Sequence, residues 1–185
     1  MKRFFALFFT LISLFILVSC GDDSDVPAGM KLASNTDIVD YKLFVPENWI
    51  VSLNDTRTAA QVSEKDRTNI NIAQWNYTGS IEDWWTKEYK PQVFEMGGFS
   101  DVNVEIEGAE LLLDKAPAQK YVYTAKMGDS YFKYEVISCV TRGSIYVIHI
   151  TYMQDAAKEG EAITYSCQEA NKEEIKSILD NFRFN

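Results

Sequence analysis

The order of apolar and polar positions predicts strands through most of the chain after residue 40. Short apolar runs at 41–45 and 49–53 are separated by a bend at Pro46, and two more runs follow at 59–63 and 69–76. In the last of these runs, apolar and polar side chains alternate, which is the period of a half-buried strand. The pattern therefore predicts that the N-terminal half opens as a β-meander.

The period changes from that of a strand to that of a helix after Ser80. Large apolar side chains recur every four residues, at Ile81, Trp85, Tyr89 and Val93. Ser80 and Asp83 have the spacing of an approximate capping box, and Pro91 predicts a kink or a break. At about 100° per residue, Trp85 lies on the buried side, whereas Trp84 is expected at the flank of the helix, partly in water.

A long strand and a hairpin follow this helix. The run 102–113 is predicted to form a strand that is bent or bulged at Gly108. A two-residue turn at 128–129 then places Tyr123 opposite Tyr134, and the same register collects further apolar side chains on that face. One face of this hairpin is therefore expected to be buried.

A second hairpin connects to the first, and its register has two alternatives. A two-residue loop at 142–143 would place His149 opposite Val136. A three-residue loop at 141–143 with a glycine bulge instead places His149 opposite Glu135. The longer loop buries one face of the sheet consistently, and we therefore favour it.

The C-terminal segment is predicted to cover the other face of the sheet. Asn171, with Glu174 three residues later, predicts a helix start, and the apolar stripe of this helix consists of Ile175, Ile178, Leu179 and Phe182. The expected fold class is therefore α+β, with an antiparallel β-sheet flanked by helices on both faces. The length of 185 residues suits one such domain.

The first twenty residues have the organisation of an export signal. Two basic residues precede an apolar run that is too short for a comfortable membrane span. Residues 17–20, Leu-Val-Ser-Cys, resemble the bacterial lipobox, in which the cysteine receives a diacylglyceryl group. The sequence thus predicts a lipoprotein signal peptide at 1–19 and a lipid anchor on Cys20, which would hold the protein at the extracytoplasmic side of the cell membrane.

Composition and charge narrow the role of the remaining chain. Residues 20–37 are rich in small and polar side chains without hydrophobic periodicity, so we expect a flexible tether before a domain at 38–185. The chain has 18 Lys and Arg against 27 Asp and Glu, a net charge of −9, which disfavours nucleic acid as a partner. Three Cys and one His offer few ligands, so neither a metal nor another cofactor is expected.

Residues 41–49, Tyr-Lys-Leu-Phe-Val-Pro-Glu-Asn-Trp, resemble the opening of PsbP-like domains, in which an apolar strand leads to a proline and then to a tryptophan. The order of strands, one central helix, long hairpins and a last helix with 178–184 at its end is similar to that family over residues 38–185. The resemblance implies a PsbP-like α/β/α sandwich, found in photosystem extrinsic proteins and in bacterial lipoproteins without known activity. No manganese, calcium or chloride-retention residue of the photosystem members matches this chain, so that role is not carried over.

Motifs for catalysis are sparse. His149 is the only histidine, and in the favoured register it neighbours Glu135 as a structural pair. The sequence has no nucleophile elbow, phosphate loop or Cys-x-x-Cys motif. Scattered acidic residues leave a carboxylate dyad open as an alternative.

The cysteines and aromatic residues supply the remaining candidates. Export to an oxidising compartment permits a disulfide between Cys139 and Cys167, and two buried free thiols are the alternative. Most aromatic side chains are expected in the core. Trp75 and Tyr77, just before the helix, are candidate contacts with sugar or peptide, and the half-exposed Trp84 is a candidate contact with a protein partner.

Together these features predict a lipid-anchored lipoprotein of the bacterial cell envelope that acts as a non-enzymatic binding or assembly module. Its partners would be the membrane, through the lipid, and an envelope protein or small ligand. The alternative is a small carboxylate-dependent hydrolase or carbohydrate-active enzyme. A pocket with two convergent carboxylates, or with Glu135 and His149 at its floor, would favour the enzyme, and a filled sandwich would favour the module.

Overall fold

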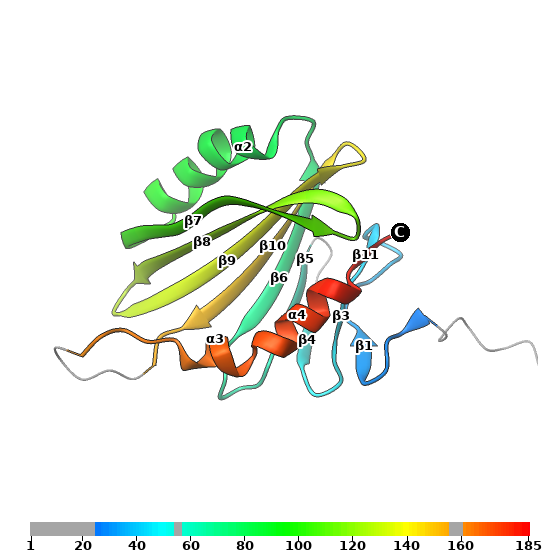
Figure 1. Ribbon diagram of the computed structural model, residues 1–185, viewed down its shortest axis with the longest axis horizontal. Coiled ribbons are helices and arrows are strands. Elements are labelled where there is room, and N and C mark those ends of the chain that lie inside the picture. The colour runs from blue at the N-terminus through cyan, green and yellow to red at the C-terminus, as the bar shows by residue number, and fades with distance from the viewer. Residues whose placement is uncertain (1–24, 54–56, 156–160) are drawn as a thin grey trace, which may run out of the picture.

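The computed structural model describes residues 25–53, 57–155 and 161–185, so the predicted signal peptide and Cys20 lie outside the described residues. Its centre is a seven-stranded antiparallel sheet with the strand order β4-β5-β6-β10-β9-β8-β7 (Figure 1). These strands are β4 (Ile50–Leu53), β5 (Arg57–Gln61), β6 (Asn69–Asn76), β7 (Ser100–Leu113), β8 (Ala116–Met127), β9 (Ser130–Thr141) and β10 (Ser144–Met153). The chain leaves the sheet after β6, and β10 returns to pair with it.

Helical segments cover both faces of this sheet (Figure 1). One face carries α2 (Ile81–Trp84), η2 (Trp85–Tyr89) and η3 (Pro91–Glu95), and the other carries α3 (Ser166–Ala170) and α4 (Lys172–Asn181). Two separate clusters of buried side chains fill the two interfaces between sheet and helices. The predicted α+β class, with an antiparallel sheet between helices, is confirmed.

Two small two-stranded sheets are formed by residues 30–46 and by the C-terminal residues 183–184. Strand β1 (Met30–Leu32) pairs with β3 (Phe44–Pro46), and β2 (Tyr41–Lys42) pairs with β11 (Arg183–Phe184). The apolar run at 41–45 was expected to begin the meander, but it forms these small sheets instead. The predicted tether at 20–37 is wrong in its second half, because β1 is paired and the residues that follow it, Ala33 and Ser34, are buried.

The strand and hairpin predicted after the helix are confirmed. In the β8–β9 hairpin Tyr123 lies opposite Tyr134, and Gly128 has a φ of 61° in the two-residue turn, a conformation that glycine adopts without a steric penalty. Strand β7 loses its register with β8 around Gly108, where φ is 79°. This irregularity marks the predicted bulge, and bulges bend and twist a strand.

The register favoured for the β9–β10 hairpin is wrong. His149 lies opposite Val136 and Glu135 opposite Ile150, around a two-residue turn in which Arg142 and Gly143 both have positive φ. Both faces of β10 are apolar, so the hydrophobic pattern did not distinguish the two registers. Because a slip of one residue moves every side chain to the opposite face, Glu135 and His149 lie on opposite faces of the sheet and form no pair.

The helical segment after β6 begins as predicted and then departs from an α-helix. The Ser80 hydroxyl accepts a hydrogen bond from the Asp83 amide at 3.0 Å. Two wide π-helical turns follow, and the chain passes through Pro91 without the predicted break. In a π-helical turn each residue advances by less than 100° around the axis. The apolar side chains of η2 and η3 therefore lie nearer to the side of Trp84 than the regular α-helix of the prediction would place them. Trp84 is 2% exposed and Trp85 is also buried, and the predicted exposure of Trp84 is therefore wrong.

The C-terminal helix lies where the sequence predicts it. Asn171 occupies the N-cap position of α4, and the side chains of Ile175, Ile178 and Phe182 are buried. The Asn171 side chain does not cap the helix. Its Nδ2 instead donates to Asp66 at 2.7 Å, which fastens the start of α4 to the loop between β5 and β6.

Candidate functional site

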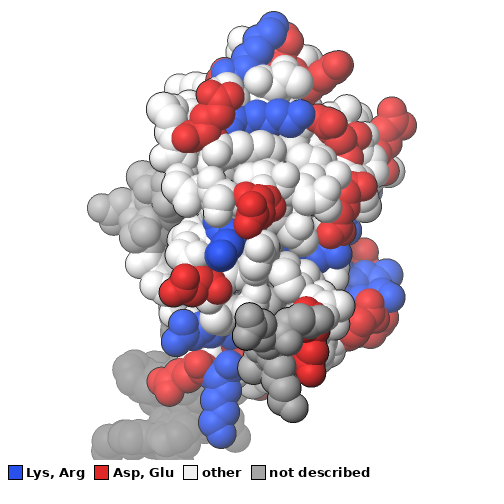
Figure 2. Space-filling view, turned by 90° about the vertical axis from the view of Figure 1, so that its left-hand side faces the viewer, with Lys and Arg blue, Asp and Glu red and all other residues white. Residues whose placement is uncertain are grey.

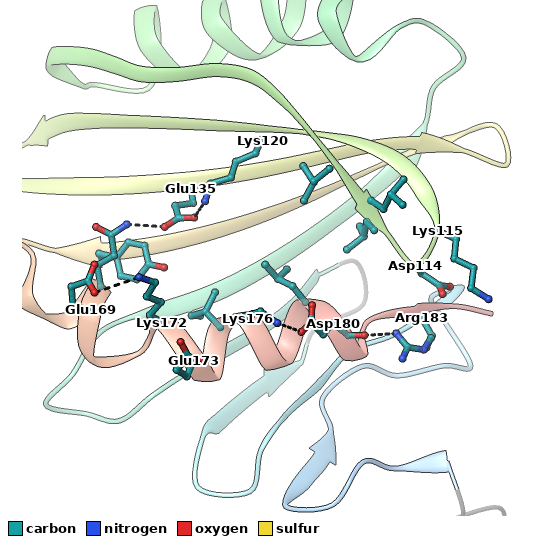
Figure 3. Close-up of a pocket in the computed structure, with 17 residues that line it drawn as sticks. Asp114, Lys115, Lys120, Glu135, Glu169, Lys172, Glu173, Lys176, Asp180 and Arg183 are labelled. Atoms are coloured by element: carbon teal, nitrogen blue, oxygen red, sulfur yellow. Dashed lines mark hydrogen bonds and ion pairs between the residues drawn. The ribbon is translucent and has the colours of Figure 1, made fainter.

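A hollow of about 1000 Å³ lies between α4 and the tip of the β7–β8 hairpin (Figure 3). Seven strands at about 4.8 Å spacing make a sheet about 29 Å wide, whereas one helix is about 10 Å across. Helix α4 therefore covers only part of the sheet face on which it packs. The tip of the hairpin closes one end, where Asp114 accepts a hydrogen bond from the Phe184 amide at 2.8 Å. We call this hollow the α4 groove.

A charged cluster forms the floor of the α4 groove. The Glu135 side chain pairs with Lys120 through one carboxylate oxygen, and Gln168 donates a hydrogen bond of 2.9 Å to the other. Glu135 is only 7% exposed, and burial, with the nearby Glu135 charge, raises the pKa of the Tyr152 hydroxyl. A buried carboxylate needs such partners, because an unpaired charge away from water costs several kcal/mol. Both carboxylate oxygens of Glu135 are thus engaged.

Apolar side chains line the walls of the α4 groove from both sides. Leu111 and Leu113 come from β7, and Ile175 and Leu179 come from α4. Leu112 also borders the groove and is 70% exposed. The groove therefore offers apolar surface above a charged floor.

The rim of the α4 groove carries cationic and anionic side chains in equal number. Apart from Glu135 and Lys120 of the floor, eight charged side chains border the groove, four cationic and four anionic: Lys115, Lys172, Lys176, Arg183, Asp114, Glu169, Glu173 and Asp180 (Figure 3). The whole chain has 18 basic against 27 acidic residues, so the groove is less acidic than the protein around it. Figure 2 shows that charges of both signs are also interspersed on the side of the molecule that lies to the left in Figure 1.

Three of the five carboxylates that border the α4 groove are paired with cations. Glu135 pairs with Lys120, Glu169 lies 3.7 Å from Lys172, and Asp180 pairs with Lys176. A dyad that shares one proton requires two carboxylates held against each other. His149, which the enzyme interpretation placed beside Glu135, lies on the opposite face. The sandwich is not filled on this face, but its hollow contains an ion pair where the enzyme interpretation required an acid and a base.

The predicted binding residues lie on the other face of the sheet. Trp75 is 39% exposed and its ring centre is 6.1 Å from that of Trp84, so the structure brings these two candidates together. Both border a second hollow, of about 420 Å³, between the helical segment and strands β6 and β10. Tyr77 does not border it, and its hydroxyl donates to the Ser80 carbonyl at 3.2 Å. We call this second hollow the tryptophan hollow.

The predicted disulfide is not formed, and both described cysteines are free thiols. Cys139 lies opposite Tyr146, whereas the Cys167 sulfur donates to the carbonyl of Met153 at 3.4 Å. Those two partners are seven residues apart on β10, or about 23 Å at about 3.3 Å per residue. A disulfide requires α-carbons within about 7 Å. Burial raises the pKa of the Cys139 thiol to about 11.

Within 25–53, 57–155 and 161–185, no group of three or more His, Cys, Asp or Glu side chains is arranged to hold a metal ion. No helix in the same ranges is long and apolar enough to cross a bilayer.

The floor of the α4 groove was not recognised in the sequence. The sequence pattern indicates Glu135 only as a neighbour of His149, and it does not indicate Lys120, Tyr152 or Gln168 as site residues. One signal was available, because Glu135 interrupts a largely apolar run at 134–140, and the structure buries residues 134–139 of it. A charge inside such a run requires a partner, but the partner comes from other elements.

Comparison with known proteins shows the fold. No family model matches the chain, and no curated protein matches it. The solution structure of the cyanobacterial PsbP protein of Synechocystis is 14% identical with a TM-score of 0.60, over 92% of this chain and 99% of that one. LpqN of Mycobacterium tuberculosis, which is involved in cell envelope biogenesis, is 12% identical with a TM-score of 0.50, over 78% and 83%. The expected PsbP-like fold is thus confirmed.

Proposed function

We propose that this PsbP-like chain is a lipoprotein of the bacterial cell envelope, anchored through Cys20 on the extracytoplasmic side. Within that role, it acts as a non-enzymatic module that binds another envelope protein. The signal-like N-terminus and the lipobox-like residues 17–20 support the location. LpqN, a chain of the same fold, is involved in envelope biogenesis, which agrees with it.

The observation that carries the binding role is the α4 groove. Its volume of about 1000 Å³ is at the upper end of ligand sites, which span about 300 to 1000 Å³. Apolar walls with a balanced, charged rim have the anatomy of a protein interface, in which an apolar centre is surrounded by polar groups. We therefore infer that a segment of a partner protein places apolar side chains against Leu111 and Leu179 and ionic side chains at the rim.

The geometry favours binding over hydrolysis at this site. A general acid or base must exchange its proton with a substrate at hydrogen-bond distance. The Glu135 oxygens are already engaged by Lys120 and Gln168, and the imidazole of His149 is on the far side of the sheet. The α4 groove therefore supports the module rather than the carboxylate-dependent enzyme.

Site-specific photo-crosslinking tests the binding role. A benzophenone amino acid replaces Leu112, which borders the α4 groove, and in a control it replaces Met96, which is 74% exposed at the end of η3. Irradiation of intact cells should give a discrete adduct from position 112 and not from position 96. Adducts of equal pattern from both positions, or none from position 112, would refute the proposed interface.

The lipid anchor is tested separately. Replacement of Cys20 by Ala removes the sulfur that would carry the diacylglyceryl group, and membrane fractionation then measures where the protein is found. The variant should leave the membrane fraction, since two or three acyl chains provide the attachment and the acidic body provides none. A variant that partitions with membranes as the wild type does would exclude this anchor.

A further inference from the structure

The tryptophan hollow lies on the sheet face opposite the α4 groove, and it has a different chemistry. Trp85 in η2 stacks on Tyr121 of β8, with ring centres 3.9 Å apart, so this helical segment covers the β8 side of its face. The side formed by β6 and β10 remains partly open as a hollow of about 420 Å³. Its polar and indole lining comes from strands β6 and β10 and from the helical segment α2–η3, and consists of Asn71, Trp75, Trp84, Glu88, Gln92 and His149.

Trp75 is the unusual residue in this lining. The other three tryptophans of the chain are at most 2% exposed, whereas Trp75 is 39% exposed. Its ring is tilted by 48° against that of Trp84, which supports it from the side of the helix. The hollow therefore presents one accessible indole to solvent, held in place by a buried one.

The polar side chains in the tryptophan hollow offer both donors and acceptors. Asn71 and Gln92 supply amides, Glu88 supplies a carboxylate, and His149 supplies an imidazole. Gln92 is exposed, and Asn71 and Glu88 are partly exposed. The Asn71 Nδ2 donates one hydrogen bond to the Asn69 side chain at 2.6 Å, which leaves its second N–H and its carbonyl oxygen for a ligand. An entirely apolar ligand would remove water from these groups without replacing its hydrogen bonds, which costs about 1 to 3 kcal/mol for each group left unpaired.

We propose that the tryptophan hollow binds an uncharged sugar ring of a glycan. A pyranose has an apolar C–H face that stacks on indole, and hydroxyl groups around its edge that both donate and accept hydrogen bonds. Trp75 supplies the indole, and Gln92, Asn71 and Glu88 supply partners for the hydroxyls. The size of the hollow is near the lower end of ligand sites and suits a mono- or disaccharide.

Charge and exposure distinguish this ligand from two alternatives. An anionic ligand is disfavoured by Glu88 and by the net charge of −9. A quaternary ammonium group binds within a cage of several accessible aromatic faces. Trp84 and Tyr89 are buried, so only Trp75 offers an accessible face. The proposal does not depend on the α4 groove, since the two hollows lie on opposite faces of the sheet.

Titration of the detergent-solubilised full-length protein tests the proposal. The probes are maltose, cellobiose and N,N′-diacetylchitobiose up to millimolar concentration, with choline and indole as comparison ligands. Because Trp75 is the exposed tryptophan, binding of a saccharide should shift the tryptophan emission to the blue, and calorimetry gives its affinity. We expect at least one saccharide to bind and the comparison ligands not to displace it.

Three variants then locate the site. Trp75→Ala should weaken the saccharide at least tenfold, Gln92→Ala should weaken it about threefold to tenfold through one lost hydrogen bond, and Met96→Ala should not change it. Circular dichroism checks that each variant is folded. If Trp75→Ala does not fold, Gln92→Ala still tests the site, because Gln92 is exposed and its replacement should not disturb the core. Absence of binding by all three saccharides, or equal affinity in wild type and both lining variants, would overturn the proposal. Displacement by choline or indole would assign the hollow to a cation or an apolar ligand instead.

Discussion

The two faces of the sheet are built from different side chains, although each is covered by one helical layer. Under α2, η2 and η3 the core is aromatic, and the hydroxyls of Tyr89 and Tyr123 pair within it at 2.9 Å. Under α4 the buried strand residues are largely aliphatic, and the ion pair of Glu135 and Lys120 lies at the edge of the packed region. A single helix is too narrow for a seven-stranded sheet, so each face retains a hollow, and the local side chains decide its chemistry.

The largest expected effect is on the aromatic face. Trp85→Ala and Trp84→Ala should each lower the free energy of unfolding by about 3 to 5 kcal/mol, because both indoles are buried and leave cavities. On the aliphatic face, Ile178→Ala should cost about 2 to 4 kcal/mol. Urea denaturation measures all three. A loss below about 1 kcal/mol for Trp84→Ala would show that its side chain is not in the core.

The ion pair on the α4 face should give the next largest effect. Lys120→Met leaves the buried Glu135 charge without its cation and should cost about 2 to 3 kcal/mol, less than for a fully buried pair because the Lys120 side chain is 33% exposed. Adding Glu135→Gln to this variant should restore most of the loss. Urea denaturation of the single and double variants forms a double-mutant cycle. Additive losses would mean that the pair contributes no coupling.

A smaller, pH-dependent effect is expected where α4 joins the sheet. Burial acts to raise the pKa of Asp66, but hydrogen bonds from Asn171 and Thr68 outweigh it and hold the pKa below its ordinary value of 3.8. The charged form therefore stabilises the fold above about pH 4, and this contribution is lost as the pH falls through the lowered pKa. Asp66→Asn should cost about 1 kcal/mol at pH 7. In thermal denaturation, the difference from wild type should shrink below pH 4, and a difference independent of pH would contradict this account.

The smallest effect concerns thiol reactivity and not stability. Cys139 is buried with a pKa of about 11, whereas Cys167 is partly exposed. In the folded protein a maleimide should therefore label Cys167 faster than Cys139. After unfolding without reductant, both should react. Two unreactive thiols in the unfolded state would show a disulfide between them, against the structure.

Patterns that depend on neighbours in the sequence predicted much of this fold. The cap at Ser80, the turn at Gly128, the bulge at Gly108 and the stripe of α4 each rest on interactions within a few residues, and each is present. The alternation of apolar and polar side chains predicted the strands near the middle of the chain, because this pattern also depends only on neighbouring residues. Strand β1 was not predicted, because its three residues are held by pairing with β3, which lies more than ten residues away in the sequence.

Tertiary structure decided the features on which both hollows depend. Since both faces of β10 are apolar, the turn at Arg142 and Gly143 and the pairing with β6 fixed its register, and that register separated Glu135 from His149. Trp84, the last residue of α2, is buried just before the π-helical turns begin, where the helical segment packs on a sheet that presents aromatic rings. By itself, the sequence determined the α+β class, the helical coverage of both faces and most turns, because these follow from local periodicity. The structure alone decided which charged and aromatic side chains border each hollow, because a change of one residue in register exchanges the two faces.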